Sequence, residues 1–138
     1  MPSGEKQVDS DDDLHVIDDE LKIIAELEKY IGAPIPQAKR FGGPSASTFY
    51  RTAFAAKDGF VHYLSINKKE LVDLPESVSS LERLEYLYLR DNHLKTIPKC
   101  VRALGSLKDL DVFNNRITTI PDWIGDLRTL QRADLSRN

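Results

Sequence analysis

Residues 84–92 read LEYLYLRDN, and the same pattern returns as LKDLDVFNN at 107–115 and as LQRADLSRN at 130–138. Each copy ends in an asparagine, so Asn92, Asn115 and Asn138 stand 23 residues apart. A fainter copy over 61–69 ends in Lys69 instead. A fixed period of this length is typical of stacked structural units, and it predicts a solenoid whose function lies on a surface.

Two kinds of apolar spacing alternate along the repeats. Within each copy the apolar residues alternate, as in Leu87 and Leu89, which predicts a short strand with one buried face. A second apolar set at wider spacing follows, and it contains a proline in every unit: Pro75, Pro98 and Pro121. Because proline fits the first turn of a helix but not its interior, these prolines predict where a short helical return segment starts.

The recurring asparagine has a predicted structural role. Its short amide can turn inward and hydrogen-bond backbone groups that the bend after each strand leaves unpaired, and stacking then makes a ladder of such amides. Lys69 has no acceptor oxygen, so the first unit must satisfy this bend differently. Ala133 replaces a leucine in the last unit, which predicts a thinner core there.

The pattern LxxLxLxxNxLxxLPxxxxxLxx resembles the leucine-rich repeat family, in its short 23-residue intracellular form. The resemblance covers residues 61–138, as three full units and one partial unit. It implies an α/β fold, a leucine-rich-repeat solenoid with a curved, mostly parallel sheet on its concave face. It also implies that the concave face is the surface that recognises a partner.

Residues 13–60 are predicted to form an N-terminal cap. An amphipathic helix over 13–31 is indicated by apolar residues every three or four positions, and Gly32 and Pro34 end it. Strand formers at 48–55 and the turn signal at 57–59 predict a β-hairpin whose second arm is the first repeat strand. This arrangement resembles the cap of some prokaryotic leucine-rich repeat proteins and of Roco-type GTPases. The helix is expected to cover the open end of the stack; docking of a partner helix is the alternative.

Length and composition favour one domain. The chain has 138 residues and 41% hydrophobic content, enough to bury a core. Residues 1–12 are polar and acidic and are predicted to be a disordered tail. The sequence contains no long apolar run and no recognisable signal peptide. Cys100 is the single cysteine, which excludes an internal disulfide and favours a reducing, cytoplasmic setting.

The sequence contains no recognisable catalytic or metal-binding pattern. The three histidines share no metal-ligand spacing, and Cys100 occupies the repeat position held elsewhere by Ser77 and Trp123. Asp109, Asp111 and Asp134 are expected to form a solvated acidic patch on adjacent strands rather than an acid/base or cation site. We therefore expect no enzyme activity and no cofactor.

The strand residues that point away from the core supply the candidate binding site. Tyrosine, phenylalanine and arginine are common at binding hot spots, although aromatics on neighbouring strands can also simply pack together. The strip changes from aromatic to acidic without a basic run, which argues against nucleic acid. The predicted partner-binding residues are Tyr63, Tyr86, Tyr88, Arg90, Asp109, Asp111, Phe113, Arg132 and Asp134.

The sequence is compatible with three functions. The first is an intracellular protein–protein interaction module that binds its partner through the concave face, with no membrane contact. The second is the N-terminal recognition region of a larger multidomain enzyme, such as a Roco-type GTPase. The third is a structural repeat protein that self-associates through an open C-terminal edge formed by the last strand phrase, 130–138.

Overall fold

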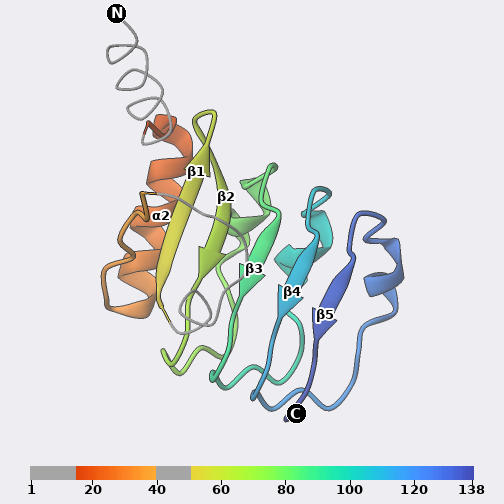
Figure 1. Cartoon of the computed structure of the whole chain (residues 1–138). Coiled ribbons are helices and arrows are strands. Elements are labelled where there is room, and N and C mark those ends of the chain that lie inside the picture. Colours follow the sequence, from red (N-terminus) through yellow and green to blue (C-terminus); the bar gives the residue numbers. More distant parts are fainter. Residues whose placement is uncertain (1–14, 40–50) are drawn as a thin grey trace, which may run out of the picture.

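The computed structural model of the chain describes residues 15–39 and 51–138 (Figure 1). A five-stranded sheet runs in the order β1-β2-β3-β4-β5, and a short 3-10 helix follows each of the repeat strands β2, β3 and β4. The elements are α2 (Asp18–Ile31), β1 (Ala53–Lys57), β2 (Phe60–Ser65), η1 (Glu76–Ser80), β3 (Tyr86–Tyr88), η2 (Lys99–Ala103), β4 (Asp109–Asp111), η3 (Asp122–Asp126) and β5 (Arg132–Asp134).

The repeat period sets the register of the sheet. Strands β2 to β5 are parallel, and residues 23 positions apart stand side by side, as Leu64, Leu87 and Leu110 do. Strand β1 is antiparallel to β2 and forms the hairpin expected from the sequence. In the turn between them Asp58 and Gly59 both have positive φ, at 53° and 86°, which is the backbone of a tight two-residue hairpin turn.

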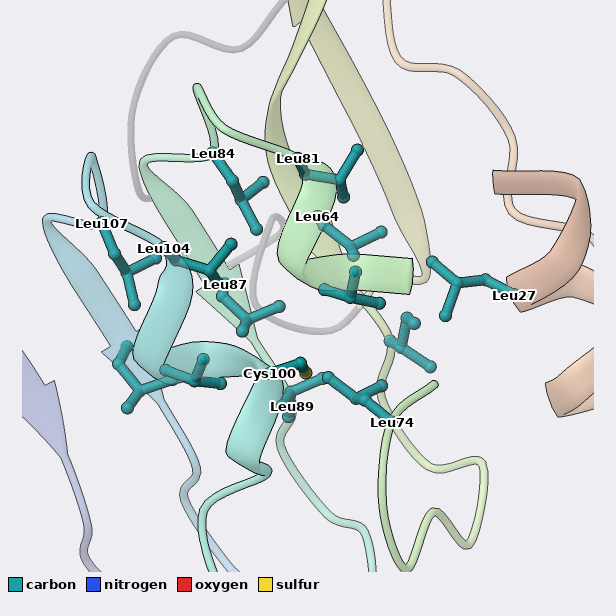
Figure 2. Close-up of a cluster of buried hydrophobic side chains, with 14 of the residues drawn as sticks. Leu27, Leu64, Leu74, Leu81, Leu84, Leu87, Leu89, Cys100, Leu104 and Leu107 are labelled. Carbon is teal, nitrogen blue, oxygen red and sulfur yellow. The ribbon is translucent and has the colours of Figure 1, made fainter. Parts of the chain in front are cut away.

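The core lies between the sheet and the 3-10 helices (Figure 2). In β2, β3 and β4 and directly after them, the alternating residues predicted to point inward, such as Leu87 and Leu89, are fully buried there. Burial of one leucine side chain contributes about 1.5–3 kcal/mol, so the stack gains stability with each unit. Each 3-10 helix starts directly after the predicted proline: Pro75, Pro98 and Pro121.

The asparagine ladder forms as predicted. Asn115 donates from Nδ2 to the carbonyls of Leu89 and Val112, both at 2.9 Å, and its Oδ1 accepts from the Leu94 amide at 3.1 Å. Asn92 and Asn138 make equivalent contacts in their own units.

The bend of the first unit is bonded by Asn92 of the next unit, so Lys69 requires no separate arrangement, contrary to the expectation from the sequence. Asn67, placed two residues before Lys69, accepts the Arg90 amide at 2.9 Å and donates to the hydroxyl of Ser65. The Lys69 amide donates to Oδ1 of Asn92 in the next unit. Asn92 therefore bonds the first bend as Asn115 bonds the second, and Asn67 adds contacts to Ser65 and to Arg90.

The N-terminal helix is shorter than predicted. It begins at Asp18, because the backbone of residues 16 and 17 pairs with the hairpin turn instead: Val16 bridges to Gly59, and the Ile17 amide donates to the Gly59 carbonyl at 2.9 Å. Ile23, Ile24 and Leu27 are buried in the core, so the helix packs on the end of the stack (Figure 1). The predicted tail (1–12), the helix start at 13–14 and the strand formers at 48–50 lie outside the described residues.

A buried carboxyl joins this helix to the first repeat. Glu20, on α2, is buried and accepts a hydrogen bond from the amide of Val61 in β2. Burial raises the pKa of Glu20, although the Val61 amide and Arg83 act in the opposite direction. No helix in the described part of the chain is long and apolar enough to span a bilayer.

Candidate functional site

The sheet register aligns the predicted binding residues in columns on the face opposite the core. Tyr63, Tyr86, Asp109 and Arg132 are successive register partners from β2 to β5. The neighbouring column contains Tyr88, Asp111 and Asp134 on β3 to β5. Arg90 and Phe113 follow the ends of β3 and β4. We call this surface the concave face.

Part of the concave face is buried, contrary to the expectation that its side chains are exposed. Tyr63 and Tyr88 are buried, with their ring centroids 5.5 Å apart in an edge-to-face contact, and Ala55 lies in the same small cluster. Burial raises the pKa of Tyr63 to about 12 and also raises that of Tyr88. These two tyrosines therefore pack against each other across neighbouring strands, which is the alternative that the sequence left open.

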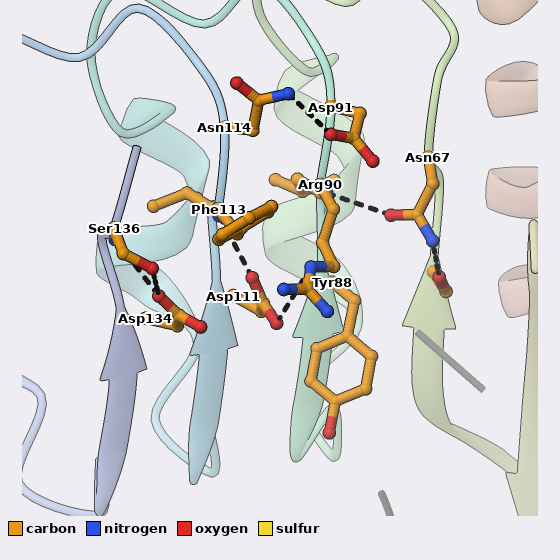
Figure 3. Close-up of polar contacts among 12 residues, drawn as sticks. Asn67, Tyr88, Arg90, Asp91, Asp111, Phe113, Asn114, Asp134 and Ser136 are labelled. Carbon is orange, nitrogen blue, oxygen red and sulfur yellow. Dashed lines mark hydrogen bonds and ion pairs between the residues drawn. The ribbon is translucent and has the colours of Figure 1, made fainter. Parts of the chain in front are cut away.

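The expected solvated acidic patch is also corrected. Asp109 is buried and accepts a hydrogen bond from the Tyr88 hydroxyl at 3.0 Å, and Arg132 reaches it at 3.3 Å. Asp111 is buried as well; it accepts from the Phe113 amide at 3.0 Å and lies 3.5 Å from Nε of Arg90 (Figure 3). Burial raises the pKa of the Asp111 carboxyl. These carboxylates are therefore structural partners of the arginines.

The rest of the concave face is accessible. Tyr86, Arg90, Phe113 and Asp134 are partly exposed, and the Arg132 side chain is 50% exposed. We call these five residues the concave patch. The guanidinium of Arg90 stacks over the Phe113 ring at 4.3 Å, and Asp134 accepts hydrogen bonds from the amide and hydroxyl of Ser136 (Figure 3).

Arg137 belongs to the same region but was missed from the sequence. Its guanidinium lies 5.7 Å from the centroid of the Phe113 ring. The alternation rule selects only residues within the strand, whereas Arg137 stands in the bend that follows it, with a φ of 56°. The repeat pattern contained a signal for Arg137, because the equivalent position of the preceding unit lies directly after Phe113.

A second polar cluster lies where the strands begin. Glu85 bonds His62 on one side at 2.9 Å and Lys108 on the other at 2.8 Å, and these three residues share one repeat position. Beside them is a hollow of about 360 Å³, lined also by Arg83, whose guanidinium stacks 3.7 Å from the Phe60 ring. No sequence motif indicates this cluster, although the 23-residue period shared by His62, Glu85 and Lys108 identifies it.

The remaining reactive side chain is buried. Cys100 lies in the core, and burial raises the pKa of its thiol to about 12, which keeps it protonated at neutral pH. Among the described residues, no group of histidine, cysteine, aspartate and glutamate side chains is arranged to hold a metal ion.

Comparison with known families matches the repeats directly. Residues 61–117 fit the family described as leucine rich repeat. Residues 61–117 are therefore leucine-rich repeats. Such repeats stack into solenoids whose concave surfaces generally serve in protein recognition. The comparison with curated proteins finds no match.

Solved structures show the same architecture. A leucine-rich repeat protein of Leptospira interrogans is 33% identical over 54% of this chain, with a TM-score of 0.52. This chain spans only 19% of that protein. The leucine-rich repeat ectodomain of the receptor kinase SOBIR1 from Arabidopsis thaliana is 23% identical, covers 90% of this chain and 69% of its own, and has a TM-score of 0.62. This second likeness concerns the fold alone.

Proposed function

We propose that this leucine-rich repeat chain binds a protein partner through the concave patch. The observation that supports the proposal is that Phe113 is partly exposed and stacked by the Arg90 guanidinium, among the other accessible residues of the concave patch. A partly exposed aromatic next to arginines is the type of side-chain group that dominates binding hot spots. Because Arg90 already contacts Asp111 and Phe113, little side-chain entropy is lost when a partner arrives.

A capture experiment from source cells tests this proposal. The immobilised wild-type chain is compared with a Phe113→Ala, Arg132→Ala variant, and an exposed pair away from the concave face, Val72→Ala with Arg128→Ala, serves as control. We expect the first variant to lose the captured protein through a loss of about 2 kcal/mol or more of binding free energy, while the control retains it. Equal retention by a folded patch variant would rule out the concave patch as the binding surface.

The proposal includes no catalytic step. The Cys100 thiol is buried and protonated, and the carboxylates of Asp109 and Asp111 are held by hydrogen bonds and arginines. A general base or nucleophile needs access to a substrate, which these groups lack. We also propose a cytoplasmic setting, in keeping with a single reduced cysteine, and cell fractionation tests it.

A larger multidomain enzyme, such as a Roco-type GTPase, is a second context for the same binding function. In its favour, the chain spans 19% of the Leptospira protein that it resembles, so repeats of this kind do occur within longer chains. Sequencing of the complete reading frame decides: a phosphate-binding GxxxxGK[ST] motif in the same frame supports this context.

Self-association through β5 is a second candidate function, favoured by the sequence of that strand. The carbonyls of Asp134 and Ser136 accept amides from the preceding unit, so the amide and carbonyl of Ala133 point to the other side. Two β5 strands paired antiparallel about Ala133 would place Arg132 of one copy opposite Asp134 of the other. The pair is then joined by two matching ion pairs.

Charge exchange tests this association in the 138-residue chain. We expect Arg132→Asp and Asp134→Arg to be monomeric when each is alone, because like charges then face each other. An equimolar mixture should form a heterodimer in sedimentation, since the two variants again present opposite charges. A monomeric wild type at high concentration, or no recovery on mixing, would refute the pairing.

A further inference from the structure

We infer that the partner segment bound by the concave patch is acidic, with carboxylates that meet Arg132 and Arg137 and an apolar side chain that meets Phe113. This inference rests on the proposed function and adds the chemistry of the partner. It reverses the expectation from the sequence alone, in which the strip becomes acidic toward its C-terminal strands.

The carboxylates on this face already have partners within the chain. Asp109 and Asp111 are buried, and each is held by a hydrogen bond and an arginine. Asp134 accepts two hydrogen bonds from Ser136, and its side chain is 21% exposed. A basic partner would therefore meet carboxylates that are hidden or already bonded.

The guanidinium groups are the accessible charges. The Arg132 side chain is 50% exposed while it contacts Asp109 and Asp134. Arg137 is exposed and makes no ion pair with any residue in the described part of the chain. A guanidinium presents a planar set of donors that suits a carboxylate, and it can bond one carboxylate inside the chain and another outside.

The aromatic ring sets the second requirement. Phe113 is partly exposed, with the Arg90 guanidinium over its ring at 4.3 Å (Figure 3). The Arg137 guanidinium lies 5.7 Å from the centroid of the same ring. An apolar side chain that packs on the ring edge would displace water from both guanidiniums, and this strengthens their attraction to nearby carboxylates. An extended segment whose residues two apart are in turn acidic and apolar, as in Asp-Ser-Leu-Ser-Asp, fits this surface, because alternate side chains of a strand point the same way.

Binding of defined probes tests the inference. The peptide Asp-Ser-Leu-Ser-Asp, its counterpart with lysine in place of aspartate and a thymidine oligonucleotide are titrated into the isotope-labelled chain, with amide resonances as the readout. We expect the acidic peptide to shift Phe113, Arg132 and Arg137, with binding that weakens as salt is raised. Arg137→Gln should weaken it about fivefold, whereas Arg128→Gln, which removes an exposed arginine elsewhere, should leave it unchanged.

The outcomes separate this inference from the proposed function. Preference for the lysine peptide or the oligonucleotide, or no acidic-peptide binding at these residues, overturns the acidic partner. If the patch variant still loses the captured protein in those cases, concave binding stands with another partner chemistry. If that variant keeps its partner, the proposed function fails, whatever the peptides do.

Discussion

At the scale of single residues, the bend after each strand imposes a left-handed backbone once per repeat. Lys68, Asp91, Asn114 and Arg137 all have φ between 55° and 56°. Asparagine and aspartate tolerate this conformation better than lysine does. The side-chain amide of Asn114 also donates to the Asp91 carboxylate at 2.7 Å, a contact that a lysine at the equivalent position cannot accept.

We expect Lys68→Asn to raise the free energy of unfolding by about 0.5 to 1 kcal/mol, because it relieves part of the cost of a left-handed residue. Urea denaturation measures the change. Lys95→Asn makes the same substitution at an exposed residue outside the left-handed set and should bring no gain. Equal gains at both positions would contradict the backbone argument.

The ladder asparagines predict a second contrast. Asn115→Ala should cost about 1–3 kcal/mol, because it leaves the Leu89 and Val112 carbonyls and the Leu94 amide without partners. Lys69→Ala should cost little, since only the backbone of that residue takes part in the bend. Similar losses at positions 69 and 115 in a denaturation series would refute this role.

Glu20 makes stability depend on pH. Its pKa in the folded chain is raised above 4.5, so its contribution is fully present below that pH and is lost as the pH rises through the folded value. Glu20→Gln keeps an acceptor for the Val61 amide without a charge. We expect this variant to be at least as stable at pH 7 and to flatten the decline above pH 4.5.

The difference between the wild type and Glu20→Gln isolates this carboxyl from Asp111, whose pKa is raised in the same direction. Glu26→Gln, on an exposed position of the same helix, is the matched control. An advantage of the wild type over Glu20→Gln that grows from pH 4 to pH 7 would contradict the assignment.

At the scale of elements, the sequence period predicts well what local packing decides. The strands, the prolines before the return segments and the antiparallel hairpin follow from spacing that repeats in every unit. The helix start was wrong, because the backbone of Val16 pairs with Gly59, some forty residues away, and no local signal reports that contact. The alternation of apolar and polar residues along a strand likewise predicts which face of the sheet a side chain occupies, but not whether neighbouring side chains bury it there.

Tyr88 shows the consequence of that limit. The sequence predicts that Tyr86 and Tyr88 both point away from the core as binding residues, but Tyr88 is fully buried and bonds Asp109. We now expect Tyr88→Ala to lower the free energy of unfolding by about 3–5 kcal/mol, as loss of a buried aromatic does. Tyr86→Ala, at a partly exposed position, should cost clearly less; equal losses in thermal denaturation would contradict this division of the face.

At the scale of the whole molecule, burial falls toward the last repeat. The leucines of the middle units are fully buried, whereas Leu130 and Leu135 are partly exposed and Ala133 is exposed. In a stack where each repeat contacts only its neighbours, opening a repeat with a neighbour on one side breaks one interface instead of two. Stability should therefore decrease along the stack toward β5.

Hydrogen exchange measures this gradient. The Leu89 amide donates to Asp111 between β3 and β4, and the Val112 and Asn114 amides donate to residues 134 and 136 of the last unit. In a dilute sample we expect slow exchange at Leu89, faster exchange at Val112 and Asn114, and the fastest repeat exchange within 128–138. Raising the protein concentration should slow Ala133 if two β5 strands pair. Uniform protection along the repeats of a dilute monomer would show that the last unit is as stable as the middle ones, contrary to the burial pattern.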